Sequence, residues 1–155
     1  MSTTSSGTAI ITGGGTGVGR ATALQLAGLG YDIAIVYSRS STEAEQTVRD
    51  VAAAGGRALA IKADVANDAE VRAMVGEVVA AFGRVDVLVN GAGTMEFIPF
   101  DDLDAVADEV WDKLFRVNVV GAFHCARAVR QAMLDSGGGI IINVSQVADG
   151  HVAAE

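Results

Sequence analysis

The chain of 155 residues is poor in the features that mark several protein classes. A single cysteine, Cys125, excludes an internal disulfide. Lysine and arginine form no runs, and 11 basic residues against 19 acidic ones give a formal charge of −8. This balance argues against a nucleic-acid or anionic-membrane partner, whose phosphates attract basic patches. No apolar run approaches the length of a membrane span, and the polar residues 1–7 lack the charged and apolar regions of a secretory signal. We therefore expect a cytoplasmic protein without a membrane partner.

Apolar residues, in contrast, make up 50% of the chain. That share and the length fit a single domain over residues 1–155, large enough to bury a core. Strand-sized apolar runs alternate with segments of helical periodicity, which is the pattern of an α/β protein with a parallel sheet covered by helices on both faces. We place the strands at residues 8–12, 32–37, 57–61, 85–89 and 139–144.

Three helices are indicated by start signals or by an apolar face. Thr42 to Glu45 has the spacing of a capping box for a helix that ends at Gly55. Asn67 can cap a second helix, which ends before Gly83. The longest helix is expected to present the following residues along one face: Trp111, Leu114, Asn118, Gly121, Cys125 and Val129.

A glycine-rich turn follows the first strand and precedes a helical stretch rich in alanine and leucine. Glycine lets the backbone approach a phosphate closely and adopt positive φ, and the next helix supplies free N–H groups and the positive end of its dipole. Glycines at such a turn can also serve only to form it. We take the turn as a candidate dinucleotide site made by Gly13, Gly15, Thr16, Gly17, Val18 and Gly19.

Further segments resemble signatures of the classical short-chain dehydrogenase/reductase family. The turn has that family's spacing, Thr-Gly-x-x-x-Gly-x-Gly, beginning at Thr12. Asn90 to Gly93 is similar to its Asn-Asn-Ala-Gly, with Val89 in the place of the first Asn and Gly91 as an inserted residue. The remaining matches are Asp64-Val65, Val117-Asn118-Val119 and residues 140–147. The chain is therefore similar to the amino-terminal part of this family, including its 3-oxoacyl-carrier-protein reductases and glucose-dehydrogenase-like members.

The resemblance implies a three-layer, doubly wound sheet of the Rossmann type with strand order 3-2-1-4-5, from which the later strands are missing. It implies that Asp64, with Val65, accepts a hydrogen bond from the adenine amino group. It also implies that the glycines of this segment, Gly91 and Gly93 with Ala92 between them, let the chain pass close to the adenine ribose, and that Asn90 ties the central strands together. An ordinary loop aspartate is the alternative for Asp64.

The residue after the second strand selects between NAD and NADP in such folds, because an acid there binds the ribose 2′-OH and repels a 2′-phosphate. Here Tyr37 stands in that place, followed by Ser38 and Arg39, which offer a hydroxyl and a guanidinium to a phosphate. A solvated surface arginine is the alternative interpretation. We expect NADP, with NAD as the second choice.

Hydride transfer to a carbonyl needs a proton donor and a group that polarises the substrate oxygen. The family supplies these with a Ser, a Tyr and a Lys, assisted by an Asn that holds a water in a proton relay. Asn118 matches the Asn, although a structural role in its helix is the alternative. Ser145 is the candidate serine, but the family's catalytic serine aligns with Gln146.

The family's Tyr-x-x-x-Lys does not occur in the 155 residues, and neither His124 nor His151 replaces it. We therefore expect the natural chain to continue past Glu155 and to act as an NADP(H)-dependent oxidoreductase on a small carbonyl or alcohol substrate, with Met95 to Ile98 beside the substrate. The alternative is an inactive nucleotide-binding or subunit-partner module. No metal site is expected. The apolar edge at residues 140–142 favours association, and we expect a homo-oligomer.

Overall fold

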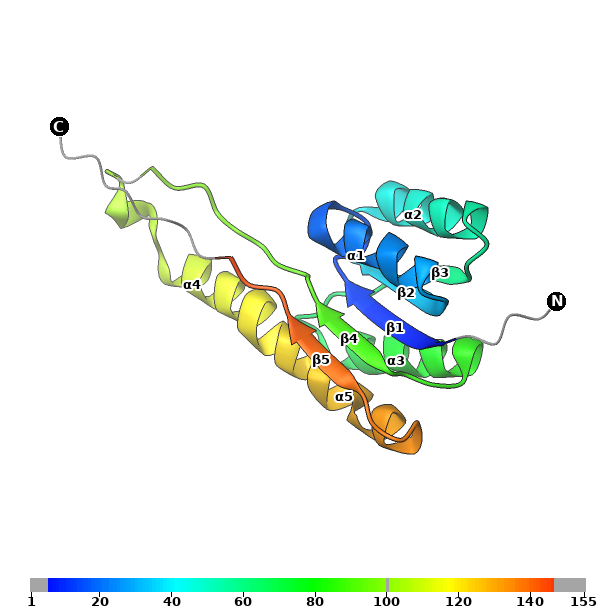
Figure 1. The fold of residues 1–155 in the computed structure, drawn as a ribbon. Coiled ribbons are helices and arrows are strands. Elements are labelled where there is room, and N and C mark those ends of the chain that lie inside the picture. Colours follow the sequence, from blue (N-terminus) through cyan, green and yellow to red (C-terminus); the bar gives the residue numbers. More distant parts are fainter. Residues whose placement is uncertain (1–5, 100, 147–155) are drawn as a thin grey trace.

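The computed structural model describes residues 6–99 and 101–146. Strands and helices alternate along most of this range (Figure 1). The strands are β1 (Gly7–Thr12), β2 (Tyr31–Tyr37), β3 (Ala58–Lys62), β4 (Val87–Asn90) and β5 (Ile140–Asn143). The helices are α1 (Gly17–Gly28), α2 (Ser41–Ala53), α3 (Asp68–Phe82), α4 (Asp108–Phe115) and α5 (Gly121–Asp135), with a 3-10 turn η1 (Leu103–Ala105) and a π-helical segment η2 (Arg116–Val120).

The five strands form one parallel sheet in the order β3-β2-β1-β4-β5. This confirms the predicted doubly wound, Rossmann-like topology, and each predicted strand lies within one or two residues of an observed one. All carboxyl ends of the strands lie on the same edge of a parallel sheet, and the order reverses between β1 and β4. A crevice at that edge is the place where doubly wound folds bind their ligands.

Both faces of the sheet are covered, so its central strands are apolar on both sides. Alternate residues of β1 point to opposite faces: Ile10 packs in a cluster with α3 and α5, whereas Ala9 and Ile11 pack in a second cluster with α1 and α2. Figure 1 shows the two pairs of helices on opposite sides of the sheet. Every residue of β1 is buried, and every residue of β5, at the edge, is exposed.

One predicted helix cap is present and one is wrong. The Asn67 side chain accepts from the backbone N–H groups of Ala69 and Glu70 at the start of α3, as predicted, and Gly83 ends that helix in the left-handed conformation. Helix α2, however, begins at Ser41, and its N-cap Ser40 makes no side-chain cap hydrogen bond. The capping box expected at Thr42 is absent because Thr42 already lies inside the first helical turn.

The longest helix is interrupted, and its predicted single face is wrong in its first half. The π-helical segment η2 separates α4 from α5. A π turn takes more residues than an α turn, so it rotates the faces on its two sides relative to each other. Cys125 and Val129 of α5 are buried, whereas Trp111 of α4 is 63% exposed. Figure 1 shows α4 projecting beyond the sheet, with the segment after β4 running beside it. Among the described helices, none is both long and apolar enough to cross a membrane.

Candidate cofactor cleft

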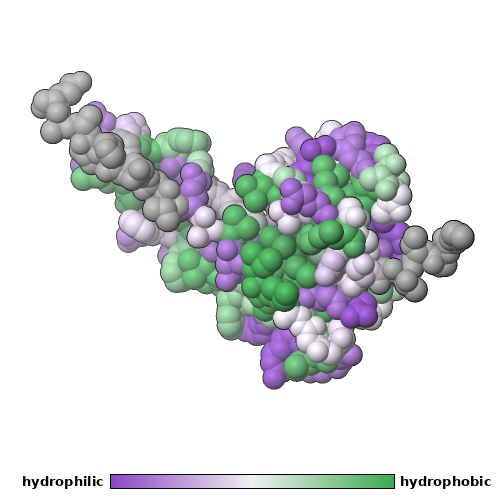
Figure 2. Space-filling model, in the orientation of Figure 1, coloured by the Kyte–Doolittle hydropathy of each residue, from purple (hydrophilic) through white to green (hydrophobic). Residues whose placement is uncertain are grey.

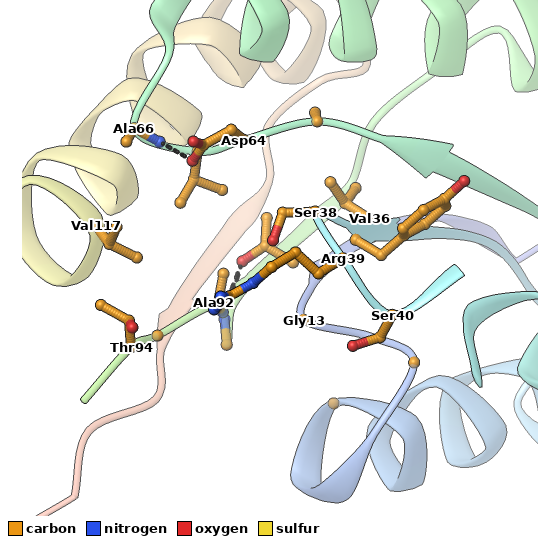
Figure 3. A pocket seen from close by; sticks show the side chains of 18 of the residues that line it. Gly13, Val36, Ser38, Arg39, Ser40, Asp64, Ala66, Ala92, Thr94 and Val117 are labelled. Atoms are coloured by element: carbon orange, nitrogen blue, oxygen red, sulfur yellow. Dashed lines mark hydrogen bonds between the residues drawn. The ribbon is translucent and has the colours of Figure 1, made fainter. Parts of the chain in front are cut away.

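A cleft of about 1000 Å³ opens at the carboxyl edge of the sheet, beyond the ends of β1 and β4. It is lined by the ends of β1, β2 and β3, by the segments that follow β4 and β5, and by residues of α1, α3, α4 and η2 (Figure 3). The structure brings all but one of the predicted cofactor residues to this cleft: Gly13, Gly15, Thr16, Gly17, Val18, Gly19, Tyr37, Ser38, Arg39, Asp64, Val65, Ala92 and Gly93. The exception is Asn90.

The glycine-rich turn uses its glycines in different ways. Gly13 has φ +69°, and a Cβ there would lie 2.8 Å from the Gly91 carbonyl oxygen, because the turn packs against the segment after β4. A Cβ at Gly19 would lie 2.3 Å from the Gly13 carbonyl oxygen, so the start of α1 can sit under the turn only without a side chain. Gly17 has φ +49°, and a Cβ there would meet no protein atom within 4 Å. A side chain at Gly17 would therefore extend into the open cleft.

The first turn of α1 lacks both a side-chain cap and an acidic residue of its own. Its N-cap, Thr16, makes no side-chain hydrogen bond to the helix, and the first turn contains no acidic residue. The free N–H groups and the positive dipole end of a helix attract an anion such as a phosphate. The amino end of α1 lines the cleft and so provides a suitable place for a pyrophosphate.

Thr12 is a positioning residue to which the sequence assigned no role. Its hydroxyl oxygen accepts from the backbone N–H groups of Gly91 and Ala92, both at 3.1 Å, and lies 3.4 Å from the Val89 carbonyl oxygen, to which it donates. These bonds attach the segment after β4 to the end of β1. The sequence signal that could have identified Thr12 is its place as the first residue of the Thr-Gly-x-x-x-Gly-x-Gly spacing.

The loop after β2 brings Ser38, Arg39 and Ser40 to the cleft beside Gly13 (Figure 3). Tyr37 ends β2, and no acid follows it before Ser40. Within residues 6–99 and 101–146, Arg39 forms no ion pair, although most of the other arginines described do. Lys62, which the sequence analysis did not consider, pairs with Tyr37 in the sheet register and lines the same cleft.

Asp64 lies in the loop after β3, and several hydrogen bonds fix that loop. The Asp64 Oδ1 atom accepts from the Ala66 backbone N–H at 2.9 Å. Glu70, in the first turn of α3, accepts from the Asp64 backbone N–H at 2.9 Å and from the Asn67 side chain at 2.8 Å. Glu70 is thus another residue that sequence reasoning missed, although it stands three positions after the Asn67 cap, where a capping acid is expected.

A second, smaller hollow of about 470 Å³ adjoins the cleft and contains both predicted catalytic residues, Asn118 and Ser145. The Asn118 side chain accepts from the Thr94 N–H at 2.8 Å and donates to the Thr94 carbonyl at 2.9 Å. Its amide group is therefore engaged with the backbone of the segment after β4. Ser145 is exposed just beyond the end of β5, and Gln146 follows it.

Asn90 lines this second hollow rather than the cleft. Its side-chain nitrogen donates to the Asn143 Oδ1 atom at 2.9 Å and to the Ala122 carbonyl at 3.4 Å. It therefore ties β4 to β5 and to α5, as the resemblance implied. The pairing of β4 with β1 is unbroken from Val87 to Asn90, so Gly91 follows the strand and is not inserted into it.

The remaining candidates lie away from both hollows. Met95 to Ile98 line neither of them, and Glu96 is ion-paired with Lys113 of α4. Cys125 is fully buried, and burial raises the pKa of its thiol to about 12. His151 lies outside the described residues. The described part of the chain contains no cluster of His, Cys, Asp and Glu side chains that could hold a metal ion.

Comparison with known proteins agrees with this geometry. A family model described as short chain dehydrogenase matches residues 7–154. The chain is 41% identical over 140 residues to the 3-oxoacyl-[acyl-carrier-protein] reductase FabG of Staphylococcus epidermidis, covering 90% of this chain and 56% of that protein. It is 47% identical over 102 residues to the short-chain dehydrogenase/reductase homolog YusS of Bacillus subtilis, covering 66% of this chain and 94% of that protein.

Among solved structures, a 3-ketoacyl-ACP reductase from Sinorhizobium meliloti 1021 superposes with a TM-score of 0.81 at 37% identity. The match covers 89% of this chain and 53% of that one. The chain thus spans little more than half the length of the reductases it matches, and nearly all of the Bacillus relative. The family match, the sheet order and the cleft at the carboxyl ends of the strands place this chain in the short-chain dehydrogenase family.

Proposed function

We propose that this chain binds NADP(H) in the cleft and forms the cofactor-binding part of an oxidoreductase that transfers a hydride between nicotinamide and a carbonyl or secondary alcohol. The observation that carries the proposal is the convergence of thirteen predicted cofactor residues, from separate parts of the sequence, on one cleft. The reductase names of the relatives support a ketone or acyl thioester as the substrate class.

The residues present fit a dinucleotide. The uncapped first turn of α1 and the open space at Gly17 suit the pyrophosphate. Asp64 has one carboxylate oxygen engaged by Ala66, which orients the group toward an adenine amino donor. Gly93 and Thr94 line the continuation of the cleft toward Asn118. The bound nicotinamide supplies or accepts the hydride, and the protein's task is to hold and orient it.

NADP is preferred over NAD in this proposal for an electrostatic reason. A 2′-phosphate needs cations and donors where NAD needs an acceptor for its 2′-hydroxyl. Ser38, Arg39 and Ser40 supply donors beside the end of β2, and no carboxylate within the described ranges neutralises Arg39. Lys62 adds a second positive charge to the same wall.

Asn118 and Ser145 are proposed to serve the chemical step, since both line the hollow next to the cofactor cleft. With its side chain bonded to Thr94, Asn118 would offer its main-chain carbonyl to a water in the proton relay. The 155 residues lack Tyr-x-x-x-Lys and carry Gln146 at the family's serine position, which favours a second candidate function, a nucleotide-binding or subunit-partner module.

The cofactor assignment is tested by Gly17→Val, with Gly55→Val as the matched control. Both glycines have positive φ, and neither has a protein atom within 4 Å of the added Cβ, but Gly55 lies outside the cleft. We expect NADPH affinity, measured by titration calorimetry, to collapse in the Gly17 variant and to persist in the Gly55 variant. Equal affinity in both variants would remove the pyrophosphate from this turn.

The two candidate functions are separated by turnover. We expect these 155 residues to bind NADPH without reducing a panel of ketones and acyl thioesters, because loss of a catalytic proton donor costs a factor of about 10² to 10⁴. A longer form that carries Tyr-x-x-x-Lys should restore NADPH oxidation at 340 nm, and Asn118→Ala in that form should slow it without abolishing cofactor binding. A longer form that binds NADPH and reduces nothing would favour the binding module.

A further inference from the structure

His124 is a buried imidazole that the proposed chemistry does not use. It lies in α5 with 9% of its surface exposed, and its Nδ1 atom is 2.9 Å from the carbonyl oxygen of Val65, in the loop after β3. A carbonyl oxygen only accepts hydrogen bonds, so Nδ1 must carry the proton. The ring therefore donates to the backbone of the loop that contains Asp64.

The same face of α5 holds the Val65 side chain. Gly121, one turn before His124, packs so closely against Val65 that a Cβ at Gly121 would lie 2.6 Å from its Cγ2 atom. Further along the helix, Arg127 forms a 2.8 Å ion pair with Asp68, the first residue of α3. Three consecutive turns of α5 thus contact the Asp64 loop and the helix that follows it.

The opposite wall of the cleft is attached to the same helical run. Asn118, one turn before Gly121, holds the backbone of Thr94 through two hydrogen bonds. In Figure 3, the run that contains Val117 lies between the Asp64–Ala66 loop and the segment at Thr94. The residues 118–124 therefore set the distance between the adenine side of the cleft and the segment that leads to Asn118.

We propose that His124 is a positioning residue for the adenine end of the cofactor, acting through the Val65 carbonyl. This inference rests on the proposed function, because it assumes that the cofactor's adenosine lies beside Asp64 and Val65. Glu70 fixes the loop at the Asp64 N–H, on the α3 side, and His124 fixes it one residue later, at the Val65 carbonyl, on the α5 side. Without the second bond, the loop keeps its attachment to α3 and loses the hydrogen bond that fixes the Val65 carbonyl against α5.

A matched pair of variants isolates the hydrogen bond. His124→Asn keeps a donor, because the Asn Nδ2 atom is as many bonds from Cα as the His Nδ1 atom. His124→Leu has nearly the shape of the Asn variant and no donor. Titration calorimetry with NADPH and with adenosine 2′,5′-bisphosphate measures the dissociation constant and the binding-competent fraction separately, and thermal unfolding records any loss of stability.

We expect the Leu variant to bind both ligands about 3- to 10-fold more weakly at unchanged stoichiometry, and the Asn variant to bind within about 2-fold of the unmodified chain. Equal losses for the two ligands would place the effect in the adenosine half. Gly121→Ala displaces Val65 without touching His124, and it should also weaken the binding of both ligands at unchanged stoichiometry. This variant replaces His124→Leu in the test if the Leu variant does not fold.

A Leu variant with a lower melting temperature or stoichiometry but an unchanged dissociation constant would overturn the inference and leave His124 with a purely structural role. Weaker binding of the Asn variant, to the level of the Leu variant, would also overturn it, since the donor would then be irrelevant. Failure of the unmodified chain to bind NADPH is a different result, because it removes the proposed function and this inference with it.

Discussion

β1 and β5 are parallel strands of one sheet with similar sequences, yet they differ completely in burial. Ile10 and Ile11 of β1 have no exposed surface, whereas Ile140, Ile141 and Ile142 of β5 are 62%, 42% and 46% exposed. β1 has β2 and β4 on its two sides and helices on both faces, and β5 has a single neighbouring strand. An isoleucine run therefore specifies a strand, and the neighbours of the strand decide how much it contributes to stability.

The same contrast extends to the helices and to the surface. Helices α1, α2 and α3 pack on the sheet along their length, whereas α4 continues past it and keeps Trp111 and Phe115 at least 60% exposed. Figure 2 shows hydrophobic residues gathered in the middle of the face that carries the β5 edge. The cofactor cleft lies beside the covered strands β1 and β2, which we call the closely packed region. The predicted catalytic residues Asn118 and Ser145 lie at the edge of the region formed by β5 and α4, which we call the open region.

The largest expected effect separates the two strands directly. Ile10→Ala leaves a cavity between β1, α3 and α5, and should lower the free energy of unfolding by about 2–5 kcal/mol. Ile141→Ala removes a side chain that is 42% exposed, and should cost less than about 1 kcal/mol. Urea denaturation of both variants makes the comparison. Similar losses would mean that β5 is as well covered in solution as β1.

A smaller effect is expected at the cofactor cleft. Arg39→Ala should reduce the preference for NADPH over NADH by about 1.5–3 kcal/mol, roughly tenfold to a hundredfold, because the phosphate loses a charge-assisted donor. Arg130→Ala is the control, since Arg130 is an exposed arginine of α5 outside the cleft. The affinities of both variants for both cofactors decide the point. An unchanged preference in the Arg39 variant would show that the loop after β2 does not contact the phosphate.

Asp68, at the start of α3, forms an ion pair with Arg127 of α5, and this contact between the two helices should be sensitive to acid. Hydrogen bonds from Arg72 and Arg127 lower the pKa of Asp68 from 3.8 to about 2. A lowered pKa stabilises the fold above about pH 4, and this stabilisation is lost as the pH falls from 4 through 2. Asp68→Asn should therefore be less stable than the unmodified chain at pH 6, and this difference in stability should shrink as the pH falls to 2. A difference that persists unchanged at pH 2 would exclude Asp68 as its source.

The smallest effect concerns the chemical reactivity of Cys125, in the part of α5 that packs on the core. Because burial raises the pKa of the thiol to about 12, only about one molecule in 10⁴ carries a thiolate at pH 8. Iodoacetamide should leave the folded chain unmodified over hours and label it readily in urea, as mass spectrometry can record. Rapid labelling of the folded chain would contradict this prediction, because it would show that α5 detaches from the core.

Much of the fold could be predicted from the sequence, because apolar periodicity and glycine positions are local properties. The strands and the Asn67 cap came from such signals, whereas the sheet order was implied by the resemblance to the short-chain dehydrogenase family. The π-helical segment could not be predicted, because residues 116–120 are compatible with an ordinary α-helix and carry no proline or glycine that would mark an irregular turn. The Thr42 capping box failed because the spacing leaves the first helical residue undetermined by one or two positions.

In the candidate site, too, local motifs could be recognised in the sequence and tertiary contacts could not. The glycine-rich turn and Asp64 were found because their motifs are contiguous. Thr12, Glu70 and His124 were missed because each bonds to a backbone group of another segment, at Gly91, Asp64 and Val65, respectively, and only the fold brings these partners together. Hydrogen bonds to backbone groups depend on where the chain passes and only weakly on the identity of the residue that accepts or donates.

The central claim is that the cleft beside Gly17 and Arg39 is an NADP site, and one measurement tests it most directly. Titration calorimetry of the unmodified chain with NADPH and with NADH compares the two cofactors under identical conditions. We expect NADPH to bind at one site per chain and at least about tenfold more tightly than NADH. Equal affinity for the two cofactors, or no binding of NADPH, would contradict the claim.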